Sequence, residues 1–340
     1  MYSSTEKRKL KIFMKKYYLI SPGSLTSKQM LRDLETYKKD NFFYKKEPII
    51  CKNKFVRKAL QLYFRINIKV NLPLKCIWHR FFTLSHIDLS KDENYIILGN
   101  GIFNYYDSAW LNKLKKKYNV HYILYYIDPI SGLMSKYMKD NIEQLDKDYT
   151  FTFDYEDSRR IDAIHTMCLY SKRDVPIVEK VKKNSVYFVG MNKKNRVEVI
   201  HEIWDKLQSG GIKCDFNIVG VDKDSQIKEE IHYNNMQTYD EILEHIQSYE
   251  CILEVLQPGQ SGVTLRYYEA VLYNKKLITN NQLVKKLPFY NSKYIQVFDN
   301  IEDIDINWIK KKEKIDYKYQ NEFSPINFMK KIEELTDDGR

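Results

Sequence analysis

The sequence lacks the cysteine patterns of disulfide-bonded and zinc-binding proteins. Its five cysteines are scattered, with no CxxC pair and no histidine at metal-ligand spacing: Cys51, Cys76, Cys168, Cys214 and Cys251. It also contains no run of about 18 uncharged apolar residues, so no transmembrane helix is expected. The basic N-terminus has neither the apolar core nor the small-residue cleavage site of a signal peptide. These absences predict a cytoplasmic protein in a reducing compartment.

Acidic residues are scarce in the first quarter of the chain. Residues 1–87 contain 20 Lys and Arg against 5 Asp and Glu, a local charge of +15, whereas the whole chain carries +11, so residues 88–340 sum to −4. A basic region beside a near-neutral remainder indicates an anionic partner or surface. Within it, residues 54–82 interleave Lys and Arg with Phe, Leu, Tyr and Trp. This segment is predicted either to lie on an anionic membrane or to pack on a sheet with its lysines outward.

Short apolar segments alternate with stretches of helical periodicity along the chain. Strands are predicted at residues 17–20, 95–98, 121–127 and 149–153, and again at 185–190, 216–220, 251–256 and 276–279. This alternation predicts parallel, doubly wound α/β packing. A chain of 340 residues usually forms more than one hydrophobic core. We therefore expect two Rossmann-like domains, at residues 1–170 and 183–320, and a C-terminal helix at residues 321–340.

Residues 251–280 contain the most informative local pattern. An apolar segment leads into a Pro/Gly/Ser loop that ends at Gly262, and a helix then leads to the apolar segment at residues 276–279. A glycine-containing loop that enters a helix offers backbone N–H groups and a positive dipole end to an anion. Arg266 lies on the first turn of that helix, where its guanidinium would bind a phosphate in bidentate fashion. Further candidate phosphate contacts are Ser261, Gly262 and Thr264.

This segment resembles the donor-nucleotide site of bacterial glycosyltransferases of the GT-B class. The matching residues are Pro258, Ser261, Gly262, Glu269 and Ala270. The resemblance implies two Rossmann-like domains that face each other across a cleft, with the acceptor in the N-terminal domain and the nucleotide sugar in the C-terminal one. It also implies that Glu269 binds the donor's ribose hydroxyls. Many retaining members have a second glutamate eight positions earlier, where this chain has Ser261, so neither inversion nor retention is implied.

Basic residues follow the predicted strand at 185–190, in the loop where open α/β sheets bind ligands. They are Lys193, Lys194 and Arg196. In the GT-B enzymes that this chain resembles, basic residues there contact the donor's diphosphate, whose growing negative charge must be neutralised as it leaves. The alternative is a solvated basic loop. For Arg266 and Glu269 the alternative is an amphipathic helix whose charged residues face water.

Asp128 ends an apolar strand and is the candidate general base for an acceptor hydroxyl. A turn-forming Asp-Pro pair is the alternative. Asp154 has a similar position after the next predicted strand. Asp303 and Asp305 have the DxD spacing by which another glycosyltransferase class holds a divalent metal, but they lie in an acidic stretch far from the first Rossmann-like unit. Chance explains that spacing, and no metal or other cofactor is expected.

The sequence therefore predicts a Leloir-type hexosyltransferase for capsule, lipopolysaccharide or glycoprotein-glycan synthesis. It would move a sugar from a nucleotide-activated donor to a glycan or lipid-linked acceptor, in the cytoplasm or on the inner face of the cell membrane. Two alternatives stay open. One is a non-catalytic partner subunit of the same fold, which Ser261 in place of a glutamate allows. The other is a nucleic-acid-binding protein that uses the basic N-terminal region. That region has no recognisable RNA- or DNA-binding module, so no nucleic acid is expected as a partner.

Overall fold

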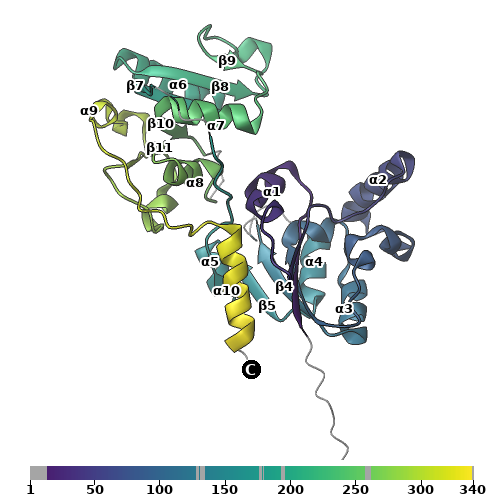
Figure 1. Ribbon diagram of the computed structural model, residues 1–340. Coiled ribbons are helices and arrows are strands. Elements are labelled where there is room, and N and C mark those ends of the chain that lie inside the picture. The colour runs from purple at the N-terminus through teal and green to yellow at the C-terminus, as the bar shows by residue number, and fades with distance from the viewer. Residues whose placement is uncertain are drawn as a thin grey trace, which may run out of the picture. The chain divides into compact units, whose positions relative to one another are not determined.

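The structure is a computed structural model that describes residues 14–127, 130, 135–175, 178, 180–192, 196–256 and 262–338. The chain divides into two compact units, which Figure 1 shows in ribbon form. Unit 1 consists of Met1–Ser171 and Phe323–Arg340, and unit 2 consists of Lys172–Glu322. Among the described helices, none is long and apolar enough to cross a membrane.

Unit 1 is built on a parallel sheet of six strands in the order β2-β1-β3-β4-β5-β6. The strands are β1 (Lys15–Ile20), β2 (Phe42–Lys45), β3 (Glu93–Gly99), β4 (Val120–Tyr126), β5 (Tyr149–Thr152) and β6 (Ile164–His165). The central strands are buried on both faces, which explains their nearly continuous apolar sequences. The strand order reverses between β1 and β3. In open α/β sheets, ligands bind at the carboxyl ends of the strands beside such a reversal.

Helical segments cover both faces of this sheet. The α-helices of unit 1 are α1 (Leu25–Met30), α2 (Lys54–Val70), α3 (Ser108–Lys117), α4 (Lys136–Gln144), α5 (Tyr155–Arg160) and α10 (Pro325–Asp338). Helices α2, α3 and α4 share one core, which includes Leu60, Leu111 and Ile142. Helix α10 and the 3₁₀ turn Arg32–Glu35 contribute to a second core on the other face, which includes Ile332.

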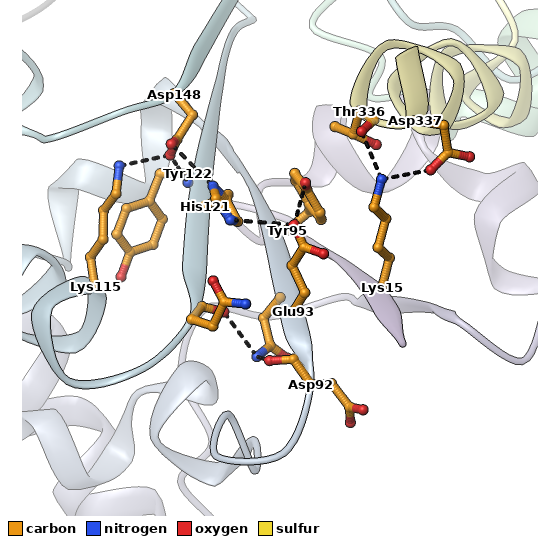
Figure 2. A network of polar contacts seen from close by, with 12 residues as sticks. Lys15, Asp92, Glu93, Tyr95, Lys115, His121, Tyr122, Asp148, Thr336 and Asp337 are labelled. Atoms are coloured by element: carbon orange, nitrogen blue, oxygen red, sulfur yellow. Dashed lines mark hydrogen bonds and ion pairs between the residues drawn. The ribbon is translucent and has the colours of Figure 1, made fainter. Parts of the chain in front are cut away.

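Helix α10 belongs to unit 1 although it follows the whole of unit 2 in sequence. The ring centroid of Phe328 lies 5.2 Å from that of Phe151 on the sheet. The Tyr17 and Thr336 hydroxyls are 2.8 Å apart, and the Lys15 ammonium donates a 2.7 Å hydrogen bond to the Thr336 carbonyl (Figure 2). The helix is therefore part of the second hydrophobic core of unit 1, and polar contacts to β1 fix its last turn.

His121 lies between two carboxylates at the start of β4 (Figure 2). Its Nε2 is 3.6 Å from Glu93, and its Nδ1 is 3.1 Å from Asp148. Asp148 also accepts hydrogen bonds from Lys115 at 2.8 Å and from the Tyr122 backbone N–H at 2.9 Å. Burial opposes ionisation of Asp148, but these hydrogen bonds outweigh it and hold its pKa below the ordinary value. The network joins the amino ends of β3 and β4 to helix α3.

Unit 2 is built on a second parallel sheet of six strands, in the order β12-β11-β10-β7-β8-β9. The strands are β7 (Lys182–Met191), β8 (Lys213–Val219), β9 (His232–Tyr233), β10 (Tyr249–Glu254), β11 (Lys276–Thr279) and β12 (Ile295–Val297). The helices are α6 (Val197–Ser209), α7 (Tyr239–Ser248), α8 (Leu265–Leu272) and α9 (Ile306–Lys310). Val186 and Phe188 enter the core beneath α6, whereas Tyr187 between them stacks on His245 of α7.

The predicted fold class, two α/β units with parallel sheets, is confirmed. The cleft between them stays a prediction.

Candidate functional site

The candidate site lies at the carboxyl ends of β7 and β10, where the strand order of unit 2 reverses. Five of the predicted site residues are described by the structure, and they are Arg196, Gly262, Thr264, Arg266 and Glu269. The other three, Asp128, Lys193 and Ser261, lie outside the described residues, as does Lys194. Arg196, Gly262 and Thr264 lie in the connections that follow β7 and β10, and Arg266 and Glu269 lie on α8.

Thr264 caps the amino end of helix α8. Its hydroxyl oxygen accepts a 3.2 Å hydrogen bond from the backbone N–H of Arg266, which satisfies one of the free donors at a helix start. The same hydroxyl donates to the carboxylate of Glu254 at the end of β10. Two residues earlier, the Gly262 carbonyl accepts a 3.3 Å hydrogen bond from the Asn281 side chain. These contacts fix the direction in which the chain enters α8.

Glu254 is a buried carboxylate that the sequence analysis did not single out. It is only 2% exposed, and its oxygens accept hydrogen bonds from the hydroxyls of Thr264 and Thr279. Burial raises its pKa, while the two hydroxyls and the charge of Arg266 act in the opposite direction. Glu254 positions the capping threonine of α8. An acidic residue inside an apolar strand is the sequence signal that would have found it.

Glu269 is fully buried on α8 and forms an ion pair with Arg266 on the same helix. One carboxylate oxygen accepts from the Arg266 guanidinium, and the other accepts a 3.0 Å hydrogen bond from the Tyr239 hydroxyl. The Arg266 side chain keeps 15% exposure. The buried negative charge is therefore balanced by a cation that still reaches the surface. The alternative in which the charged residues of this helix face water is wrong for Glu269.

Arg173 packs against the ring of Tyr239. Its guanidinium lies 5.1 Å from the ring centroid and forms an ion pair with Asp240, the next residue of α7. Its backbone N–H donates a 3.1 Å hydrogen bond to the Tyr273 hydroxyl, just beyond the end of α8. Arg173 thus holds Tyr239 in position to bind Glu269. Nothing in the sequence marks this arginine, which lies between the two domains expected at residues 1–170 and 183–320.

Arg196 lies at the start of α6 and is partly buried against the strand ends. Its Nη1 donates a 2.6 Å hydrogen bond to the Val255 carbonyl, and its guanidinium lies 5.7 Å from the Phe188 ring centroid. Burial lowers its pKa, and its Nε has no hydrogen-bond partner among the described residues. A Cβ at Gly190 would lie 2.5 Å from Nη2, so glycine there makes room for the guanidinium. The alternative of a solvated basic loop does not describe Arg196.

Unit 1 has a cavity at the corresponding edge of its own sheet. Its volume is about 370 Å³, and residues that follow β1, β2, β3 and β4 line it together with residues of α2. The lining residues are Pro22, Gly23, Ser24, Glu47, Pro48, Ile49, Arg57, Leu60, Gln61, Gly101, Asn104, Tyr105 and Ile127. Polar and apolar residues line it in similar proportion, which suits an organic ligand that carries several hydroxyl groups. The sequence pattern does not reveal these residues, because they come from five separate segments.

The two aspartates with DxD spacing cap short helices. Asp303 accepts a 2.8 Å hydrogen bond from the Asn300 backbone N–H, and Asp305 accepts one of the same length from the Asn307 backbone N–H at the start of α9. Capping explains both carboxylates. Within the part of the chain that the structure describes, no group of three or more His, Cys, Asp or Glu side chains is placed to hold a metal ion.

Solved structures of glycosyltransferases resemble this chain over almost its whole length. The apo form of the lipopolysaccharide outer core galactosyltransferase WaaB aligns with a TM-score of 0.54 at 13% identity, covering 96% of this chain and 100% of that one. Sucrose-phosphate synthase from Thermosynechococcus elongatus aligns with a TM-score of 0.54 at 9% identity, covering 96% and 99%. The chain has the GT-B fold.

A third GT-B structure is similar to the same extent. It is an alpha-glucosyltransferase in complex with UDP and a 13-mer DNA, with a TM-score of 0.52, 10% identity, and coverage of 95% of this chain and 100% of that one. No protein-family model matches the sequence, and neither does any curated protein sequence. The predicted resemblance to the GT-B class is confirmed at the level of the fold, which includes both units.

Proposed function

We propose that this chain is a Leloir-type glycosyltransferase that moves a sugar from a nucleoside-diphosphate donor to a hydroxyl group of a bacterial surface glycan. The observation that carries the proposal is the buried Arg266–Glu269 pair at the carboxyl edge of β10. The pair lies in unit 2, the C-terminal domain in which the resemblance to GT-B enzymes places the donor nucleotide. A surface glycan as acceptor is supported by the similarity to a galactosyltransferase of the lipopolysaccharide outer core.

The cations of the site suit a leaving nucleoside diphosphate, which gains negative charge as the sugar bond breaks. Arg266 keeps 15% of its side chain exposed at the start of α8, and the Nε of Arg196 at the start of α6 has no hydrogen-bond partner among the described residues. Lys193 and the segment from Ser261 to Thr264 complete the diphosphate site. Glu269 orients Arg266, and its buried carboxylate must become accessible as the donor binds in order to accept hydrogen bonds from the ribose hydroxyls.

The cavity of unit 1 is the proposed acceptor site. Ile127 lines this cavity, and Asp128 is the next residue in the chain. Asp128 is therefore our proposed general base for an acceptor hydroxyl bound there. Arg57, Glu47 and Gln61 offer polar contacts to the remaining hydroxyls of a sugar acceptor.

We infer that transfer needs no metal ion, because the arginines take over the neutralisation of the diphosphate. Sugar transfer is expected to continue unchanged after treatment with EDTA. A loss of activity that added Mg²⁺ or Mn²⁺ restores would contradict this inference.

The donor site is tested by thermal unfolding of the full chain with UDP, GDP, dTDP, CMP or NAD. A ligand that binds only the folded protein raises its apparent stability by mass action. One nucleoside diphosphate is expected to stabilise the wild type. Arg266→Lys keeps the charge but loses the bidentate guanidinium, and Glu269→Gln removes the carboxylate. Each variant should therefore need at least about tenfold more nucleotide than the wild type to reach the same rise in melting temperature.

The matched control is Arg160→Lys, because Arg160 also pairs with an acid three residues away, Asp157, but in unit 1. It should bind the nucleotide as the wild type does. If no nucleoside diphosphate stabilises the chain, or if both site variants respond normally, the proposed donor site is wrong. Donor binding without transfer to any glycan or hydrolysis would instead favour the non-catalytic partner subunit.

A further inference from the structure

Exposed apolar side chains gather on one segment of unit 1. Among the described residues, fourteen large apolar side chains are exposed, and seven of them lie between residues 50 and 77. These seven are Ile50, Phe55, Leu62, Ile66, Val70, Leu74 and Ile77. Phe55 is 85% exposed and Val70 is 65% exposed. Single exposed apolar residues are ordinary, but a contiguous group indicates an interaction surface.

Four of these side chains form a continuous stripe along α2. The α2 stripe consists of Phe55, Leu62, Ile66 and Val70. Their spacings of seven, four and four residues place them within an arc of about 80° at 100° per residue. The buried residues of α2, Leu60, Phe64 and Asn67, lie on a different side of the helix. Leu60 and Phe64 belong to the unit 1 core. Helix α2 therefore has one apolar side inside the protein and a second one exposed at the surface.

Positive charge lies along one edge of the α2 stripe. Lys54, Lys58, Arg65 and Lys69 are all exposed, and the same rotation of 100° per residue places them side by side next to the stripe. Residues 48–87 contain 8 Lys and Arg and no Asp or Glu. Long basic side chains lay their methylene groups on an apolar surface while their charges reach anionic groups above it. An apolar stripe with a basic edge is complementary to the interface of an anionic lipid bilayer.

We propose that the α2 stripe and its basic edge dock unit 1 on an anionic lipid bilayer. The stripe enters the boundary between headgroups and acyl chains, and the four basic residues contact lipid phosphates. Three residues of the same helix, Arg57, Leu60 and Gln61, line the unit 1 cavity. These residues lie on the side of α2 opposite the stripe, so docking through α2 places the cavity one helix diameter, roughly 10 Å, from the membrane surface. If the proposed function holds, the acceptor is a glycan carried on a membrane lipid.

The docking is tested by co-sedimentation of the full chain with phosphatidylcholine vesicles, with and without phosphatidylglycerol. Binding is expected only when phosphatidylglycerol is present and should weaken as salt is added. The triple variant Phe55→Ser/Leu62→Ser/Val70→Ser should lower the partition coefficient at least about a hundredfold. Lys58→Gln/Arg65→Gln/Lys69→Gln should lower it by about a hundredfold as well.

The matched controls alter similar residues of unit 2. Ile227→Ser/Met236→Ser removes two exposed apolar side chains, and Lys213→Gln/Lys223→Gln removes two exposed charges. Both controls should bind vesicles as the wild type does. Equal binding to the two kinds of vesicle, absence of binding, or unchanged binding by the α2 variants would overturn the proposal. The proposal would also be overturned if the wild type were a dimer in sedimentation velocity and the triple serine variant a monomer, because a second copy of the chain would then cover the stripe.

Thermal unfolding with nucleotide is repeated on every variant. Since vesicle binding is measured without donor, docking can fail while the nucleotide response stays intact. Conversely, a chain that binds vesicles but responds to no nucleotide would support the docking surface and contradict the proposed function.

Discussion

At the scale of single residues, the site depends on side chains that hold one another in place. Glu254 holds Thr264, Arg173 holds Tyr239, and Tyr239 holds Glu269. None of these contacts requires a ligand, so the part of the site that the structure describes is formed before a donor arrives. Pre-organisation of this kind lowers the entropy lost on binding.

Gly190→Ala tests whether the room beside Arg196 matters. The added Cβ would lie 2.5 Å from the Arg196 Nη2 and 3.2 Å from the Phe188 ring, so the guanidinium must move. We expect nucleoside-diphosphate binding to weaken about tenfold and the free energy of unfolding to fall by no more than about 2 kcal/mol. Isothermal titration and urea denaturation measure the two effects. Gly99→Ala is the control, because its Cβ would meet atoms only at 3.7 Å and beyond. Unchanged nucleotide affinity in Gly190→Ala would contradict the role given to Arg196.

Asp148→Asn tests the carboxylate network at the start of β4. The folded-state pKa of Asp148 lies below its ordinary value of 3.8. The stability that it contributes is therefore present above pH 3.8 and is lost as the pH falls through the lower folded pKa. At about pH 7 the variant should lose about 1–3 kcal/mol of unfolding free energy. As the pH falls through the folded-state pKa of Asp148, the variant should approach the wild type. Urea denaturation across this range measures both, with the exposed Asp140→Asn as control. A deficit that is constant with pH would show that ionisation of Asp148 is not the cause.

At the scale of elements, the sequence predicts what periodicity and turn residues encode. The strands around residues 95–98 and 251–256 follow from apolar segments that end at Gly, Asn or Pro, and both are present as β3 and β10. Helix α8 is predicted by the helical spacing of its apolar residues, and it begins at Leu265 because Thr264 provides the amino-terminal cap. The burial of Glu269 could not be predicted from the local sequence pattern, because its partner Tyr239 lies 30 residues away in the chain. Contacts across such a separation depend on how α7 and α8 pack, which local pattern does not specify.

Phe328→Ala tests how much the packing of helix α10 contributes to the stability of unit 1. Phe328 is 4% exposed, and its ring contacts Tyr125 and Phe151 at centroid distances of 5.2 Å. Phe328→Ala should lower the free energy of unfolding of unit 1 by about 3–5 kcal/mol, because it leaves a cavity between helix and sheet. Urea denaturation measures this loss. Lys330→Ala changes an exposed residue of the same helix and should cost less than about 0.5 kcal/mol. A similar effect of both variants would mean that α10 does not depend on this packing.

At the scale of the whole molecule, the alternation of strands and helices predicted two α/β domains, and the strand orders then place a candidate site in each. The sequence could not reveal that residues 323–340 belong to unit 1. An amphipathic helix has an apolar side that fits many sheets, and only the shapes of Phe328, Met329 and Ile332 against the first sheet decide between them. The unit 1 cavity was hidden for the same reason, since its wall is assembled from distant segments.

A fragment of residues 172–322 tests the independence of unit 2. This unit has its own core beneath α6 and α9, so the fragment should unfold cooperatively in urea and keep the nucleotide response of the full chain. A fragment of residues 1–171 lacks α10 and should be much less stable than the same fragment mixed with a peptide of residues 323–340. Circular dichroism and thermal unfolding measure both. If residues 1–171 alone are as stable as the mixture, α10 is not a required part of unit 1.

The return of α10 to unit 1 also sets an order of events during synthesis on the ribosome. Unit 1 is interrupted by the 151 residues of unit 2, from 172 to 322, which take on the order of ten seconds to translate. Throughout this interval the part of the first sheet that α10 covers lacks this helix, although the 3₁₀ turn Arg32–Glu35 already packs on the same face. Unit 2 is contiguous, so we expect it to complete its folding before unit 1, although it is made second. The nascent chain therefore exposes the Tyr125–Phe151 surface for seconds, and a chaperone that protects this protein during translation would act there.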